Sequence, residues 1–274
     1  MRRGDMNLGI SSFSYGWAVG AAVRAGAHRA AITELLGKAD DFGVGILQIG
    51  DNIPMELFSK EELAAIRREA SSSGIALEIG ARGLTVSHLQ RYVGIAVAVG
   101  ASMLRFVVDK DTYEPSVAET VDILRGGSRE FEAAGVTVAI ENHDRLRVRE
   151  LARLVDGVGS VNVGICLDTA NSLGAGEGIG RVLEVLSPLT VNVHIKDYSI
   201  KRQAPHHMGF TVDGTPAGRG MLNIPRLIET VSAYGRNPSM ILEVWTPPEA
   251  EFDSTVRKEA LWVMESVSYL QGLV

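Results

Sequence analysis

The segment from Val136 to Asp144, VTVAIENHD, decides how the rest of the chain is interpreted. It is an apolar, β-branched run that follows a glycine and ends abruptly in polar side chains. A run of this kind is typical of a parallel strand that is buried on both faces. Such a strand has no reason to end in Glu141, Asn142 and His143 unless these polar groups are used there. We therefore expect a functional site where this strand ends.

Three later segments have the same design, an apolar run that ends at or near a chemically active side chain. Their sequences are VNVGICLDTAN at 161–171, TVNVHIKD at 190–197 and SMILEVW at 239–245. They carry Asp168, His194 and Glu243, whereas the first segment carries Glu141. Four successive predicted strands thus each deliver one such side chain at or near the C-terminal end.

Predicted strands alternate with amphipathic helices along the whole chain, at a spacing of roughly 30 residues, which is the repeat of an eight-unit barrel of about 250 residues. The count of eight strands and eight helices predicts a single (β/α)8 TIM barrel that forms one domain over residues 1–274. The rival architecture, an open doubly wound sheet, needs a glycine-rich phosphate loop after its first strand. The chain has Ser11-Ser12-Phe13-Ser14 at that place.

Composition excludes several classes of protein. The 274 residues are 46% hydrophobic and carry a formal net charge of −6, so neither nucleic acid nor an anionic membrane is an expected partner. No run reaches the roughly 18 apolar residues of a membrane-spanning helix. The single cysteine, Cys166, lies in an apolar strand and is interpreted as a small buried hydrophobe. We expect a cytoplasmic enzyme with a small-molecule substrate, and leave homo-oligomerisation open.

The four side chains at the strand ends predict a metal site. The catalytic face of a TIM barrel is built from the C-terminal ends of its strands, so Glu141, Asp168, His194 and Glu243 should converge there. Three clustered carboxylates repel one another unless a cation lies between them. Oxygen-rich ligation with one imidazole suits Mn²⁺, Mg²⁺ or Co²⁺ better than a structural zinc site. Mn²⁺ is the metal we expect, with Mg²⁺, Co²⁺ and Zn²⁺ as alternatives.

The motifs ENH at 141–143, DTAN at 168–171, HIKD at 194–197 and LEVW at 242–245 resemble those of the xylose isomerase-like TIM barrels, a family of sugar phosphate isomerases and epimerases. The resemblance runs from the first strand to the last helix. It implies that the four strand-end residues are the metal ligands, and that Glu141 and Glu243 also exchange protons with the substrate. One departure is Asn171, because many of these isomerases and epimerases have a histidine at that place.

Further residues are candidates for binding substrate. His143 is expected to face the substrate or to support the site, unless it makes a structural hydrogen bond to a loop carbonyl. Lys196 either binds substrate or pairs with Asp197 or another carboxylate. Glu78 and Arg105, inside the third and fourth strands, either pair with each other or line the floor of the site. The loop at 201–220 is long, and its basic residues predict a receptor for a carboxylate or phosphate, unless it is a plain solvated loop. The basic residues of that loop are Lys201, Arg202, His206, His207 and Arg219.

These observations predict a divalent-metal-dependent isomerase or epimerase that acts on a ketose or keto-sugar, including an acidic one. Proton transfer next to a carbonyl would form an enediolate that the metal stabilises. The alternative is a lyase on the same scaffold, which decarboxylates a 3-oxo sugar acid or dehydrates a keto-sugar. A non-catalytic sugar-binding barrel is a third, weaker hypothesis.

Overall fold

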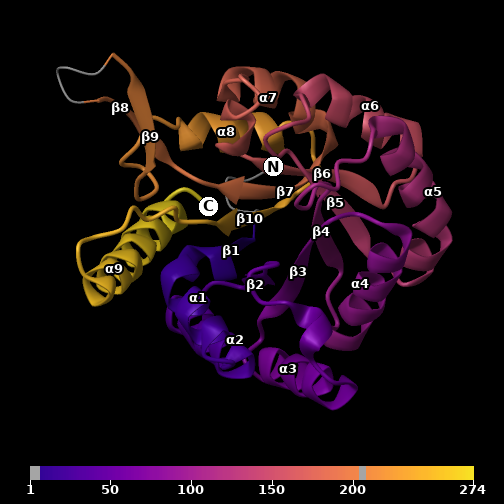
Figure 1. Ribbon diagram of the computed structural model, residues 1–274, viewed down its shortest axis with the longest axis horizontal. Helices are drawn as coiled ribbons and strands as arrows, with labels where there is room; N and C mark the ends of the chain where they lie inside the picture. The colour runs from indigo at the N-terminus through magenta and orange to yellow at the C-terminus, as the bar shows by residue number, and fades with distance from the viewer. Residues whose placement is uncertain (1–6, 204–207) are drawn as a thin grey trace.

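The computed structural model describes residues 7–203 and 208–274. Eight parallel strands close into a barrel in the order β1-β10-β7-β6-β5-β4-β3-β2, and the helices surround it (Figure 1). The predicted (β/α)8 TIM barrel is therefore confirmed. The barrel strands are β1 (Leu8–Ser11), β2 (Ile46–Ile49), β3 (Ala76–Arg82), β4 (Met103–Val107), β5 (Thr137–Glu141), β6 (Val163–Asp168), β7 (Thr190–Ile195) and β10 (Ser239–Leu242).

The helices pack their apolar faces against the outside of this barrel. Several of them begin at a side-chain cap. The Ser59 hydroxyl accepts from the Glu62 amide in a capping box, and the Thr85 hydroxyl accepts from the His88 amide. The α-helices are α1 (Gly16–Arg24), α2 (His28–Asp41), α3 (Lys60–Ser72), α4 (Val86–Val99), α5 (Val117–Ala133), α6 (Val148–Val158), α7 (Ile179–Leu186), α8 (Ile224–Ser232) and α9 (Phe252–Gln271).

Two segments differ from the sequence prediction. The aromatic segment after β1 forms a 3-10 turn, η1 (Ser12–Tyr15), and then α1, which was not predicted because its small apolar residues give little helical periodicity. The predicted long loop contains an antiparallel hairpin made of β8 (Tyr198–Arg202) and β9 (Phe210–Gly214). This hairpin projects from the rim of the barrel beside α9 (Figure 1).

A polar cluster replaces part of the apolar filling inside the barrel. Glu78 on β3 accepts hydrogen bonds from Gln48, Asn192 and Ser239, on three other strands. Arg105 on β4 instead contacts Asp51 and Glu141. The predicted alternative that Glu78 and Arg105 pair with each other is therefore wrong, because each is satisfied by other partners.

Candidate active site

The strand ends bring the four predicted side chains together. Glu141 and Asp168 are the last residues of β5 and β6, His194 lies near the end of β7, and Glu243 follows β10 directly. These strands are consecutive neighbours in the barrel, and Asp168 pairs in register with His194. All four side chains are buried, with exposed fractions between 0% and 4%.

His194 is the centre of this group. Its Nδ1 atom lies 3.5 Å from Glu243 Oε1, 3.7 Å from Glu141 Oε2 and 3.8 Å from Asp168 Oδ2. These separations exceed those of a good hydrogen bond, and Nδ1 has no hydrogen-bond partner among the described residues. Ligands of an octahedral ion with bonds of about 2.1 Å are about 3 Å apart when adjacent and about 4.2 Å when opposite. The spacing around Nδ1 thus fits a shared cation.

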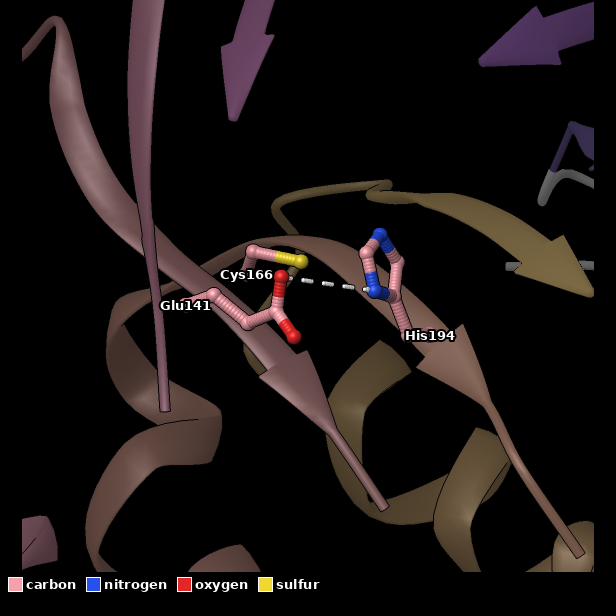
Figure 2. A group of neighbouring side chains, drawn as sticks. All are labelled: Glu141, Cys166 and His194. Atoms are coloured by element: carbon pink, nitrogen blue, oxygen red, sulfur yellow. Dashed lines mark ion pairs between the residues drawn. The ribbon is translucent and has the colours of Figure 1, made fainter. Parts of the chain in front are cut away.

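Two overlapping sets of ligand atoms lie close enough to hold an ion. Asp168, His194 and Glu243 form one set, and Glu141, Cys166 and His194 form the other, with the atoms of each set within 4.8 Å of one another. Figure 2 shows the second set, in which the three side chains point toward one another from neighbouring strands. Burial raises the pKa of the Cys166 thiol, which donates to Asn192 Oδ1 at 3.0 Å. Cys166 is buried as the sequence predicts, but nothing in the sequence indicated that it lies against the carboxylate site.

Two cations contact the carboxylates. Arg105 Nε lies 3.1 Å from Glu141 Oε2, and its side chain is 2% exposed. Lys196 Nζ lies 2.8 Å from both Asp168 Oδ2 and Glu243 Oε2. The expected alternative of an ion pair between Lys196 and a carboxylate is therefore observed, with these two partners. Lys196 also lines the cavity, so this contact does not exclude a role toward the substrate.

Burial controls the protonation of the imidazole and the ammonium differently. Burial lowers the pKa of His194 to about 4, against the opposing attraction of Glu243, so the imidazole is neutral at physiological pH. Burial also disfavours the charged form of Lys196, but Asp168 and Glu243 outweigh it and raise the pKa of Lys196 well above its usual range. The site therefore combines a neutral imidazole, which can ligate a metal, with a permanent cation.

Neutral side chains orient the carboxylates further. Ser11 Oγ donates to Glu243 Oε1 at 3.0 Å, and Asn171 Nδ2 donates to Glu141 Oε1 at 2.7 Å. Asn142 Oδ1 accepts from the Asp168 amide at 2.7 Å. Asn171 thus contacts a carboxylate of the site at the position where many sugar isomerases and epimerases have histidine. Sequence analysis missed Ser11, because a serine at the end of the first strand gives no distinctive signal.

A cavity of about 760 Å³ opens above these residues. The aromatic side chains of Phe13, Trp17 and Trp245 are among those that line it. His143 also lines the cavity, with its Nε2 atom 3.2 Å from Arg82 and its Nδ1 atom 3.1 Å from Asp144. The cavity is therefore part apolar wall and part charged floor, as a binding site for a small polar molecule requires.

The described basic residues of the predicted loop at 201–220 contact other partners. Arg219 pairs with Glu265 on α9, and the Arg202 guanidinium lies 4.7 Å from the centre of the Phe210 ring. Lys201 lies 3.8 Å from Asp213 across the hairpin. From β8 and β9, Val212 lines the cavity. The remaining predicted residues, His206 and His207, lie outside the described part of the chain, so the anion-receptor hypothesis stays a prediction.

Asp197 anchors the return of the hairpin to the barrel. Its carboxylate accepts from the backbone amides of Tyr198 and Leu222 through Oδ1, and of Gly218 and Gly220 through Oδ2, at 2.9–3.0 Å. A Cβ atom at Gly220 would lie 2.1 Å from Asp197 Oδ1, so only glycine fits there. Asp197 is therefore occupied by backbone amides, which explains why Lys196 pairs with Asp168 and Glu243 instead.

Comparison with known proteins agrees with this architecture. The sequence model of the family described as "Xylose isomerase-like TIM barrel" matches residues 31–270. The chain is 33% identical over 265 residues to 3-oxo-isoapionate decarboxylase from Pectobacterium atrosepticum, covering 97% of this chain and 95% of that protein.

Two solved structures illustrate the likeness of the fold. A D-allulose 3-epimerase from Methylomonas sp. in complex with D-allulose has a TM-score of 0.71 at 12% identity, covering 98% of this chain and 97% of that one. A xylose isomerase-like TIM barrel protein from Mycobacterium smegmatis in complex with magnesium has a TM-score of 0.66 at 14% identity, covering 88% and 89%. In the described part of this chain, no helix is both long and apolar enough to cross a membrane.

Proposed function

Because the chain belongs to the xylose isomerase-like TIM barrel family, we propose that it is a divalent-metal-dependent enzyme that acts on a keto-sugar acid through an enediolate. The observation that carries the proposal is the unpartnered His194 Nδ1 among three carboxylate oxygens. Lone pairs that face one another in a buried site are unfavourable unless a cation lies between them. The donor set therefore fits a metal ion.

Asp168, His194, Glu243 and Glu141 would hold this ion. Three carboxylates and one imidazole suit Mn²⁺, and Mg²⁺, Co²⁺ and Zn²⁺ are the alternatives. When bound, the metal would polarise a carbonyl oxygen of the substrate and so favour the enediolate. Arg105 and Lys196 lie beside these ligands and reduce the repulsion between their carboxylates.

Decarboxylation is the reaction we favour, because a relative that is similar over nearly the whole chain is a decarboxylase of a 3-oxo sugar acid. In a 3-oxo acid, the bond between the carboxyl carbon and C2 breaks, CO₂ leaves, and the electron pair forms the enediolate. A proton must then be added to C2 to give the ketone. Lys196 Nζ lies at the cavity and keeps its charge, so it stabilises the developing oxyanion, and Glu141 or Glu243 positions the proton donor.

Epimerisation or isomerisation of a ketose is the second candidate. The specific observation in its favour is the presence of two glutamates, Glu141 and Glu243, at one site. One glutamate would remove the proton next to the carbonyl and the other would return it. Both reactions share the enediolate, so the substrate decides between them: a 3-oxo acid can lose CO₂, whereas a neutral ketose cannot.

The test is to incubate purified protein, with Mn²⁺ and after exhaustive chelation, with 3-oxo sugar acids and with neutral ketoses in D₂O. We expect CO₂ release and a product deuterated at one carbon from the acid, dependent on the metal. Deuterium incorporation with an epimeric product from a ketose would favour the second candidate. Full activity after chelation, with no metal by elemental analysis, would contradict both reactions as proposed here.

A further inference from the structure

A buried polar network lies inside the barrel beneath the carboxylate site. It consists of Gln48 on β2, Glu78 on β3, Asn192 on β7 and Ser239 on β10. Gln48 and Asn192 are 0% exposed and Glu78 is 6% exposed. The interior of such a barrel is usually filled with Val, Ile and Leu, and a buried carboxylate is costly unless it is hydrogen-bonded. The network therefore calls for a functional explanation.

Glu78 fixes the direction of every hydrogen bond around it. It accepts from Ser239 Oγ at 2.5 Å, from Gln48 Nε2 at 2.9 Å and from Asn192 Nδ2 at 2.9 Å. All three neighbours donate to the Glu78 carboxyl group, so Gln48 turns its NH₂ group toward Glu78. Its carbonyl oxygen, Oε1, is thereby directed to the other side.

That carbonyl oxygen meets the imidazole of His194. Gln48 Oε1 lies 2.7 Å from His194 Nε2, and both residues are fully buried. A carbonyl oxygen accepts and does not donate, so Nε2 must carry the proton. Nδ1, in contrast, makes no hydrogen bond among the described residues, as expected of a ring nitrogen that carries a lone pair, and it is the atom that faces Glu141, Asp168 and Glu243.

We propose that Glu78 and Gln48 are positioning residues that hold His194 in its Nε2–H tautomer and present a bare Nδ1 to the cation. This inference rests on the proposed metal-dependent function. A histidine that ligates a metal commonly donates its other N–H to an acceptor, and loss of that acceptor costs about 10–100-fold in metal affinity. Here the control is indirect, because Glu78 acts on His194 through the orientation of the Gln48 amide.

The decisive variant is Glu78→Gln, which has almost the same shape but replaces one of the two acceptor oxygens with an NH₂ donor. The Gln48 amide is then free to reverse and to donate to His194 Nε2, which moves the imidazole proton to Nδ1. We expect the ¹⁵N chemical shifts of His194 in the metal-free protein to change from the Nε2–H to the Nδ1–H pattern. We also expect Mn²⁺ affinity, measured by calorimetry, to fall by about 10–100-fold.

The double variant Gln48→Glu with Glu78→Gln tests the same logic in reverse. It places the carboxylate directly against His194 and the amide one position farther away, so each donor again faces an acceptor. The Nε2–H pattern and most of the Mn²⁺ affinity should return. Ser239→Ala is the matched control, because it removes a donor to Glu78 but leaves the direction of Gln48 unchanged, and Mn²⁺ affinity should stay within about threefold.

The outcomes separate this inference from the proposed function. An Nδ1–H pattern in the metal-free wild type would overturn it, and so would an Nε2–H pattern that Glu78→Gln leaves unchanged. If Glu78→Gln does not fold, Gln48→Leu, which removes the acceptor, should lower Mn²⁺ affinity by about 10–100-fold, and the double variant should keep most of the affinity of the wild type. A wild type that binds no divalent cation would contradict the proposed function instead, while the tautomer would still be decided by the ¹⁵N spectrum.

Discussion

The two halves of the barrel contribute differently to the site. The second half, β5, β6, β7 and β10, carries the three carboxylates and the imidazole. The first half, β1 to β4, carries none of these but supplies side chains that help to hold them. Ser11 contacts Glu243, Gln48 contacts His194, and Arg105 contacts Glu141.

This difference separates two kinds of sequence signal. A carboxylate or imidazole at the end of an apolar strand is conspicuous, because burial of such a group is costly without a use. A serine or glutamine in a strand is compatible with many roles, so the sequence of the first half of the barrel gives no clear indication of a functional site. Residues that orient the site are therefore harder to find in a sequence than residues that face the reaction.

The largest effect should come from the second half. Glu243→Gln keeps the shape of the side chain but removes the charge that faces His194 and Lys196. We expect turnover to fall by about 100-fold or more, as is typical when a general acid or base is removed. Activity with saturating Mn²⁺ is the measurement. Glu249→Gln, which removes a surface carboxylate paired with Lys258, should leave activity unchanged, and a similar loss in both variants would contradict the assignment.

In the first half, replacement of Arg105 should mainly reduce stability. Arg105→Met leaves Glu141 and Asp51 without their buried cation, and loss of one partner of a buried ion pair costs about 3–5 kcal/mol. The free energy of unfolding in urea measures this. The control is Arg219→Met in the exposed loop after β9, where a surface pair contributes about 0–1 kcal/mol. Equal losses in the two variants would show that the two arginines are not distinguished by burial.

The barrel and most of the placement of the site were predictable, for physical reasons. Apolar runs that alternate with amphipathic helices leave few architectures open, and the ends of parallel strands must meet at one face. The hairpin was missed because β8 and β9 are short and partly exposed, so burial imposes no clear pattern on them. The partners of Lys196 and Glu78 depend on which strands face one another across the barrel interior, and this arrangement cannot be derived from the sequence.

A third prediction concerns Asp51, which binds Arg105 from the first half. Burial opposes ionisation of Asp51, but Arg105 and Arg82 outweigh it and lower its pKa from 3.8. A carboxylate with a depressed folded-state pKa contributes stability above its unfolded pKa and loses that contribution as pH falls below it. Asp51→Asn should therefore cost about 1.5–3 kcal/mol at pH 7, and progressively less below about pH 4.

Urea unfolding at several pH values would measure this difference. Asp213→Asn is the matched control, because its carboxylate lies 3.8 Å from Lys201 on the exposed hairpin, and it should have little effect at any of these pH values. A destabilisation by Asp51→Asn that is independent of pH would indicate that the side chain acts through packing and not through its charge.

The smallest effects should come from the hairpin, and they decide where an anionic substrate is recognised. The sequence alone predicts that Arg202→Ala raises KM for an acidic substrate by about 10–100-fold, the effect of a lost charge-assisted contact. The structure gives Arg202 a contact with Phe210 and gives Arg219 a partner on α9, and neither lines the cavity. Lys196 does line the cavity.

We therefore expect Arg202→Ala and Arg219→Ala to change KM by less than about threefold, since exposed pairs contribute about 0–1 kcal/mol. Lys196→Met should impair turnover of the same substrate far more. A large rise in KM for Arg202→Ala, with turnover unchanged, would instead show that the hairpin contacts the bound substrate. In that case β8 and β9 would cover the substrate when it is bound at the barrel.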